Sequence, residues 1–303
     1  MQSIWLIFQL LFCLAVGFIF AKSIPQWLKT LSFQVLPYFS YILLIAIAME
    51  FFQVFVEMTA PWTIIGPALT LSATTSVGAF VCCYLLFKLL GYAPSRGKVS
   101  LALFMHSLVN ISYALLALLT GLALAYFKQQ LSFDLHISSW GLLLVFMLLI
   151  GLDLAYTPLD RSWLNWKILF VPLGCILGSI AGAYASYLLL QDLSLKHALL
   201  FSQGYGFYSM SGIVITELKG AELGSIALMN DLFREIFAIL LMYCIGWRYP
   251  RAAISAAGAT AMDATLPMVK HACGNNFIPH AMVSGFILSV LAPIAVSILA
   301  AIP

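Results

Sequence analysis

Apolar runs of 17 or more residues recur along this chain of 303 residues. Each run is long enough to cross about 30 Å of hydrocarbon as an α-helix. A transmembrane barrel would instead show segments of about ten residues with alternating hydrophobicity, whereas these runs are continuous and rich in Leu, Ile, Ala and Phe. The pattern therefore predicts an all-α polytopic membrane protein.

The composition supports this class, because 63% of the residues are hydrophobic, only 8% are charged, and the mean hydropathy is +1.04. In a water-soluble protein of this composition, there would be too few polar residues to cover the hydrophobic core. The net charge of +3 is spread over the loops, so we expect no nucleic-acid partner. The six cysteines lie mostly inside apolar runs and form no Cys-x-x-Cys pair, which indicates packing residues and predicts neither a metal site nor a cofactor.

Eight full crossings are predicted, and the first is expected to be retained because no Lys or Arg precedes it, unlike in a cleavable signal peptide. Their ranges are 4–20, 34–56, 63–87, 99–127, 139–156, 166–190, 223–246 and 277–300. We predict one transporter domain over 1–303, with six helices in 1–190 and the site in 191–303.

Two further apolar stretches, 197–217 and 252–271, differ in character from the eight spans. They contain "SQGYGFYSMSG" (202–212) and "AAGATAMDATLP" (256–267), in which Gly, Ser, Thr, an acid and a Pro interrupt the apolar pattern. If both stretches re-enter the membrane and both termini are outside, the cytoplasmic loops hold ten Lys or Arg and the external loops three. The positive-inside rule favours this arrangement over ten full crossings.

The re-entrant arrangement predicts that the two stretches enter from opposite sides and that their tips meet near the midplane. Secondary transporters build sites from such broken helices, because irregular backbone at membrane depth must be satisfied by protein or by a watery cavity. The alternative is that small residues only permit close helix packing. We favour that alternative for "AGAYAS" (181–186) and the broken-helix interpretation for the other two stretches.

Charged residues within the apolar runs are the strongest site candidates, since a charge at the bilayer centre costs about 2.5–3.5 kcal/mol. Asp231, Arg234 and Glu235, with Asn230, occupy neighbouring positions on one helix face. One cation cannot neutralise two carboxylates, so an ion pair of Asp231 with Arg234 would leave the charge of Glu235 without a partner on this helix. Asp263, in the second interrupted stretch, is a further acid without a basic residue nearby in the sequence. A buried structural network, or side chains that reach the interface, is the alternative.

Surplus negative charge in a cavity would favour a cation, a proton, or each in turn. The N–H groups at the start of a half-helix would complement it by binding a carboxylate. Among other polar residues, Asp153 lies near a predicted helix end, where placement at the membrane interface is favoured over a site. His106 and Asn110 could line a cavity or form hydrogen bonds to another helix. The ring of Tyr208 could contact a cation or could only pack against apolar neighbours.

The C-terminal third contains ordered motifs that can be compared with a family: "GYGFYSMSGIVITE" (204–217), "GSIALMNDLFREIFAILL" (224–241), "GATAMDATLPMV" (258–269) and "HAMVSGFILSVLAPI" (280–294). This region closely resembles the bacterial lysine exporter LysO family. The resemblance implies an inner-membrane exporter of L-lysine and lysine analogues, in which the acids at Glu235 and Asp263 are tied to export. Asp153 departs from the pattern, because an uncharged polar residue is expected there.

The sequence and the resemblance together predict a secondary exporter of L-lysine, coupled to a proton or sodium gradient, in which lipids surround the chain and a homo-oligomer is possible. The expected substrate-binding or coupling residues are Glu235, Asp263, Asn230, Asp231, Arg234, Ser209, Ser211, Gly212, Tyr208 and Thr265. Two other functions stay open: a cation/proton antiporter without an amino-acid substrate, and an intramembrane hydrolase that uses paired carboxylates. The second is weaker, because no Gly-x-Gly-Asp, His-Glu-x-x-His or Gly-x-Ser-x-Gly motif occurs.

Overall fold

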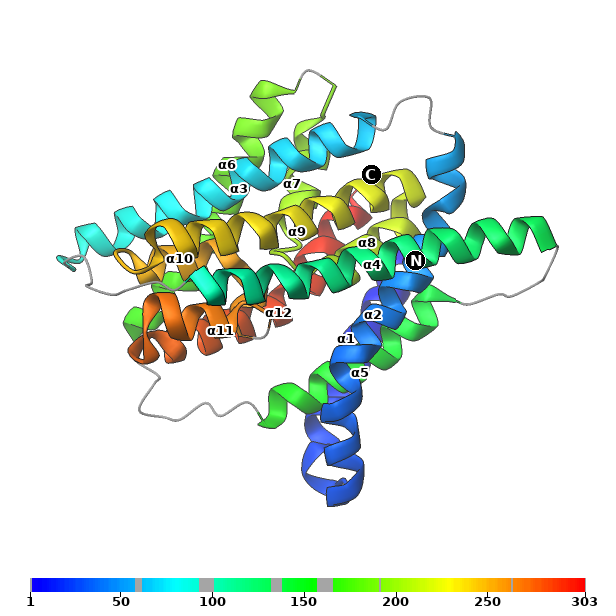
Figure 1. Ribbon diagram of the computed structural model, residues 1–303, viewed down its shortest axis with the longest axis horizontal. Coiled ribbons are helices and arrows are strands. Elements are labelled where there is room, and N and C mark those ends of the chain that lie inside the picture. Colours follow the sequence, from blue (N-terminus) through cyan, green and yellow to red (C-terminus); the bar gives the residue numbers. More distant parts are fainter. Residues whose placement is uncertain are drawn as a thin grey trace.

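A computed structural model describes residues 2–57, 62–92, 101–131, 138–156, 166–190, 192–262 and 264–302, and every regular element within them is a helix (Figure 1). The α-helices are α1 (Gln2–Phe20), α2 (Gln26–Glu57), α3 (Trp62–Leu89), α4 (Leu101–Leu131), α5 (Ser139–Tyr156), α6 (Phe170–Leu189), α7 (Leu195–Ser202), α8 (Tyr208–Lys219), α9 (Ala221–Leu241), α10 (Pro250–Ala257), α11 (Leu266–Met268) and α12 (Ile278–Ala301). Short 3₁₀ or π turns are η1 (Ala21–Ser23), η3 (Trp166–Leu169), η4 (Met242–Gly246), η5 (Gly258–Met262), η6 (Val269–Cys273) and η7 (Asn275–Phe277). The all-α prediction is confirmed for these residues.

The eight predicted spans coincide with the long helices α1 to α6, α9 and α12. Four described helical segments are long and apolar enough to cross a membrane: Trp62–Leu89, Ser139–Tyr156, Trp166–Leu189 and Asn275–Ala301. A fifth results if the two parts of α2 are counted together. The number of crossings and the external placement of both termini stay predictions.

Helix α2 bends by 48° between Leu36 and Tyr38. The sequence has Pro37 at this bend, and a proline inside a helix lacks the backbone donor of a helical hydrogen bond, which is a common cause of such kinks. The bend matters for the site described below, because Leu36, Ser40 and Tyr41 line a cavity there.

The long helices of the first part pack in three pairs, α1 with α5, α2 with α4 and α3 with α6. Figure 1 shows α1 and α5 side by side. Glycines bring these helices into backbone contact: a Cβ on Gly17 would lie 2.1 Å from the Leu148 carbonyl oxygen, and one on Gly151 would lie 2.2 Å from that of Leu14. Such close crossings are typical of membrane proteins. Lipid removes the hydrophobic driving force between helices, so the helices associate through the van der Waals packing that small residues permit.

The α3–α6 pair has the longest such seam. Gly174, Gly178 and Gly182 are spaced four residues apart on α6, and a Cβ on Gly178 would lie 2.3 Å from the Cα of Ala79. Ser186 continues the same face one turn further, and its Oγ lies 2.6 Å from Thr74 Oγ1. The packing interpretation of residues 181–186 is therefore confirmed.

Both stretches predicted to be broken are broken. Turns at 203–206 separate α7 from α8, and the 3₁₀ turn η5 ends α10. The two breaks touch, because the Ala259 N–H donates to the Tyr205 carbonyl oxygen at 2.9 Å. Gly258 permits this approach: its φ is +66°, and a Cβ there would lie 2.3 Å from that same oxygen. The predicted meeting of the two tips is confirmed, whereas their depth in the membrane stays a prediction.

The α3–α6 seam yields a direct stability prediction. Gly178→Ala should destabilise the protein by about 1–3 kcal/mol, the usual range for overpacking, because the added Cβ meets backbone that cannot swing away. Thermal unfolding in detergent would measure the loss. Gly66→Ala is the matched control, because nothing lies within 4 Å of a Cβ on this helical glycine. Equal melting temperatures for the two variants would contradict the proposed seam.

Candidate functional site

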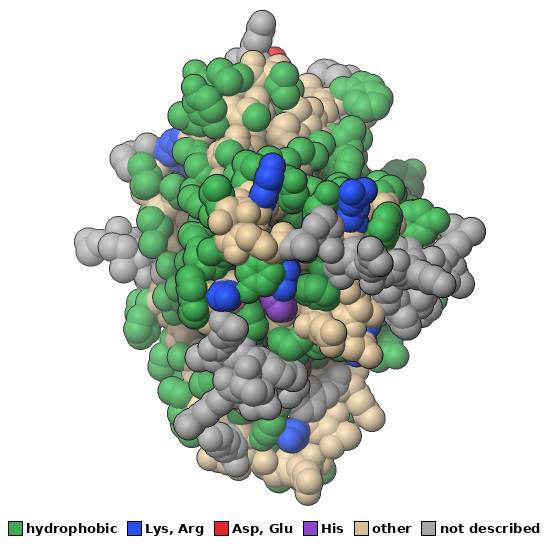
Figure 2. All heavy atoms as spheres, turned by 90° about the vertical axis from the view of Figure 1, so that its left-hand side faces the viewer, with side chains coloured by type: hydrophobic (Ala, Val, Ile, Leu, Met, Phe, Trp, Pro, Cys, Tyr) green, Lys and Arg blue, Asp and Glu red, His purple; other side chains and the backbone are tan. Residues whose placement is uncertain are grey.

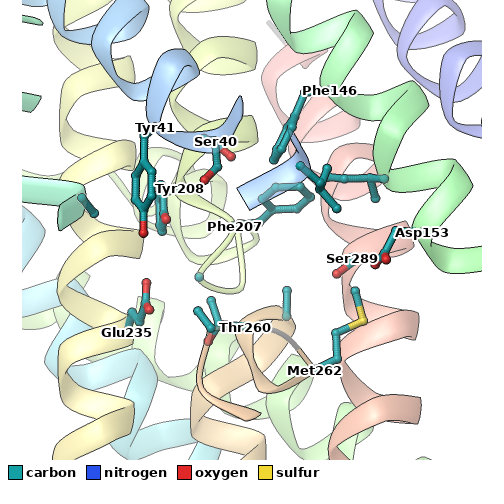
Figure 3. A pocket seen from close by; sticks show the side chains of 17 residues that line it. Ser40, Tyr41, Phe146, Asp153, Phe207, Tyr208, Glu235, Thr260, Met262 and Ser289 are labelled. Atoms are coloured by element: carbon teal, nitrogen blue, oxygen red, sulfur yellow. The ribbon is translucent and has the colours of Figure 1, made fainter. Parts of the chain in front are cut away.

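A cavity of about 450 Å³ is lined by residues of α2, α4, α5, α9 and α12 and of both breaks (Figure 3). Phe146, Ile150 and Phe207 provide part of its apolar lining. The polar side chains that line it are Ser40, Tyr41, Asp153, Tyr208, Ser209, Glu235, Thr260 and Ser289. The cavity therefore combines an apolar body with a few convergent polar groups, as ligand sites in proteins do.

Helix α9 contributes Glu235 to one side of this cavity. Its side chain is only 4% exposed, and in Figure 3 its carboxylate and the Tyr41 hydroxyl of α2 point toward one another. A buried carboxylate near a phenol and a cavity is suited to binding a cation or exchanging a proton.

A second acid, Asp153 of α5, lines the opposite side, where Ser289 of α12 points toward it (Figure 3). The sequence favoured a position at the membrane interface, near the end of the helix. The structure places this half-buried carboxylate on the cavity wall, whereas its depth in the membrane stays a prediction.

Asp231 lies one turn before Glu235 on α9 but binds the first break. It is fully buried, and its two oxygens accept from the Gly206 N–H at 3.0 Å, from Ser211 Oγ at 2.5 Å and from Asn230 Nδ2 at 3.3 Å. Asn230 Nδ2 also donates to the Phe201 carbonyl oxygen at 3.0 Å. Asp231 and Asn230 thus satisfy backbone and side-chain groups that the broken helix leaves without helical partners.

Arg234 is also fully buried and contacts both broken segments. Its Nη1 donates to the Ser202 carbonyl oxygen near the end of α7, and its Nε donates to that of Ala256 near the end of α10, both at 3.4 Å. A cation is favoured there, because the carbonyls of a helix C-terminus carry partial negative charge. Its Nη2 lies 3.1 Å from Cys175 Sγ, so this cysteine does more than fill space.

The predicted direct ion pair between Asp231 and Arg234 is wrong. No nitrogen of Arg234 lies within 4.0 Å of an Asp231 oxygen, although both side chains are described. Their spacing on the helix permits a pair, but each side chain bonds to the backbone of the breaks instead. The two opposite charges still compensate each other over a longer distance.

The ten sequence-predicted residues divide into groups. Three of them line the cavity: Tyr208, Ser209 and Glu235. Four others form the hydrogen bonds described above, which hold the broken segments: Asn230, Asp231, Ser211 and Arg234.

Gly212 and Thr265 serve the packing around the breaks. A Cβ on Gly212 would lie 3.0 Å from the Leu228 Cβ of α9, and Thr265 Oγ1 donates to the Thr260 carbonyl oxygen at 3.0 Å in the second break. Asp263 lies outside the described residues, although its neighbours Met262 and Ala264 line the cavity. The side chains of His106 and Asn110 also lie outside the description.

The site includes residues that the sequence did not single out. Tyr41, Thr260 and Ser289 line the cavity from three different elements. The only sequence feature that pointed to any of these three was the position of Thr260, which lies in a stretch already predicted to be broken. Tyr41 and Ser289 carry no such mark, since isolated Tyr and Ser are common in membrane helices.

Comparison with known proteins shows which family the sequence resembles. The profile of the family described as "Lysine exporter LysO" matches residues 115–300. The chain is 34% identical over 210 residues to Lysine exporter LysO of Escherichia coli K12, covering 69% of this chain and 67% of that protein. It is 31% identical over 153 residues to a putative lysine exporter of Haemophilus influenzae, covering 50% of this chain and 75% of that protein. No solved structure matches. The matched region contains α9, both breaks and the acids of the cavity, and the chain belongs to the lysine exporter LysO family.

Proposed function

We propose that this protein exports L-lysine from the cytoplasm across the bacterial inner membrane, and that the 450 Å³ cavity is its substrate site. The observation that carries the proposal is the presence of two carboxylates, Glu235 and Asp153, on opposite sides of one cavity. Two related proteins that bear the name of lysine exporters add support.

The charges of lysine match this arrangement. At neutral pH the amino acid carries an ammonium group at each end and one carboxylate. A carboxylate on either side of the cavity allows each ammonium group a charge-assisted hydrogen bond. The volume also lies within the range of about 300–1,000 Å³ that small-molecule sites occupy.

The first turn of α8 provides a partner for the substrate carboxylate. Tyr208 and Ser209 begin this 12-residue helix and line the cavity. The first N–H groups of a helix lack intrahelical acceptors and carry partial positive charge, which favours an anion. The apolar linker of lysine would then lie along Phe146 and Phe207.

The export cycle would use the gradient of a proton or of Na⁺. Glu235, with the family-implied Asp263, would hold an ammonium group of lysine in one state and the coupling cation in the other, since one carboxylate cannot bind both at once. The two broken segments, which line the cavity from different elements, would open it alternately to the two sides. Lysine analogues that keep both ammonium groups would be carried by the same contacts.

Removing the charge of Glu235 should stop this cycle. We expect Glu235→Gln to lower lysine export from proteoliposomes at least tenfold, because a hydrogen bond to a charged group contributes about 1.5–3 kcal/mol. Glu222→Gln is the matched control, since Glu222 is exposed at the start of the same helix. Normal export by a folded Glu235→Gln protein would contradict the mechanism.

Asp153 should determine affinity for lysine. Asp153→Asn preserves the shape of the side chain but removes its charge, so we expect the KM for lysine to rise about tenfold or more. The exposed Asp192→Asn is the control, and both KM values come from initial rates of radiolabelled lysine transport. An unchanged KM in the Asp153 variant would place the second ammonium group elsewhere.

A further inference from the structure

A second cavity, of about 390 Å³, lies where α3 ends and α10 begins, and none of the residues that line it lines the lysine cavity. Its lining includes Lys88, Arg248 and Arg251, and the described residues that line it include no Asp or Glu. Figure 2 faces this end of the molecule and shows Lys and Arg side chains gathered around a histidine, among hydrophobic side chains. A cavity with this lining repels lysine and attracts an anion.

Arg251 is the most firmly held of the three cations. Its guanidinium carbon lies 4.9 Å from the ring centre of Phe87, 4.3 Å from that of Tyr92 and 5.1 Å from that of Phe277. Its Nε donates to His280 Nε2 at 3.3 Å. Its two terminal nitrogens have no hydrogen-bond partner among the described residues, so a preoriented fork of donors remains for a ligand.

The backbone adds donors to the same wall. Pro250 is the first residue of the eight-residue helix α10, and the first helical hydrogen bond is from Ala253 N to the Tyr249 carbonyl oxygen. The N–H groups of Arg251 and Ala252 therefore precede the helical hydrogen bonds, and both residues line the cavity. Helix N-termini with neighbouring Arg or Lys favour phosphate oxygens.

The surroundings indicate that this phosphate belongs to a lipid. Leu85 and Leu89 on α3 flank Lys88 and are 47% and 85% exposed, so they present an apolar surface directly beside the cationic cavity. Tyr84 and Tyr249, which line the cavity, pack edge to face at 5.1 Å, as aromatic residues at a membrane interface often do. The adjacent leucines offer the acyl chains of a lipid a contact that a free anion would not use.

We propose that this cavity binds the phosphate headgroup of an anionic phospholipid, with Lys88, Arg248 and Arg251 as its ligands and the acyl chains along Leu85 and Leu89. Basic pockets between membrane helices on the cytoplasmic side bind such headgroups, and the positive-inside rule places these three residues on that side. A bound headgroup would neutralise the positive charge at the end from which cationic lysine approaches.

The test measures binding of phosphatidylglycerol and phosphatidylcholine to the purified full-length protein by native mass spectrometry. The wild type should retain phosphatidylglycerol preferentially. The double variant Lys88→Gln/Arg248→Gln removes two exposed charges, so its apparent affinity should fall about 25-fold, from roughly fivefold per charge. The double variant Lys128→Gln/Lys196→Gln, which removes the same charge outside the cavity, should retain wild-type affinity.

Three results would overturn the proposal. They are equal retention of the two lipids by the wild type, equal loss of phosphatidylglycerol in both double variants, and displacement of the lipid by millimolar inorganic phosphate. The last result would assign the cavity to a free anion. Melting temperatures of all variants, measured in parallel, establish that the changes in binding occur in folded protein.

Discussion

The contact between the two breaks is the constraint on which the rest of the site depends. Each break exposes backbone groups that an uninterrupted helix would satisfy, and in a membrane protein such groups need partners within the protein. The hydrogen bond from Ala259 N to the Tyr205 carbonyl oxygen satisfies one donor and one acceptor at once. Asp231 binds the first break through Gly206, and Arg234 binds the carbonyls of Ser202 and Ala256.

Helix α9 therefore serves two purposes within the five residues from Asp231 to Glu235. Asp231 and Arg234 form hydrogen bonds with the backbone of the breaks. Glu235, one turn beyond Asp231, lines the cavity that the breaks help to form. The division explains why a short sequence carries three charges in an apolar helix. Two of them hold the geometry of the site, and the third is proposed to meet the substrate.

The sequence predicted the helices and the breaks well, because both follow from local patterns. Long apolar runs set the helices, and clusters of Gly, Ser and Thr with Pro267 indicated the irregular segments. Side-chain partners were less predictable. The spacing of Asp231 and Arg234 permits an ion pair, but the carbonyl ends of α7 and α10 compete for the guanidinium, and only the tertiary arrangement brings them there. Asp153 was expected at the membrane interface because it lies near a predicted helix end, and only the packing of α5 shows that it lines the cavity.

The two cavities have linings of opposite charge. Carboxylates line the cavity proposed to bind lysine, and Lys and Arg line the cavity proposed to bind a lipid headgroup. The central claim is that the cavity between Glu235 and Asp153 is the lysine site. The most direct measurement is a structure of the protein in lipid nanodiscs at saturating L-lysine. The account predicts lysine in this cavity, with one ammonium group at each of the two carboxylates and its own carboxylate at the first turn of α8. Lysine bound at a different place, with this cavity occupied only by water, would contradict it.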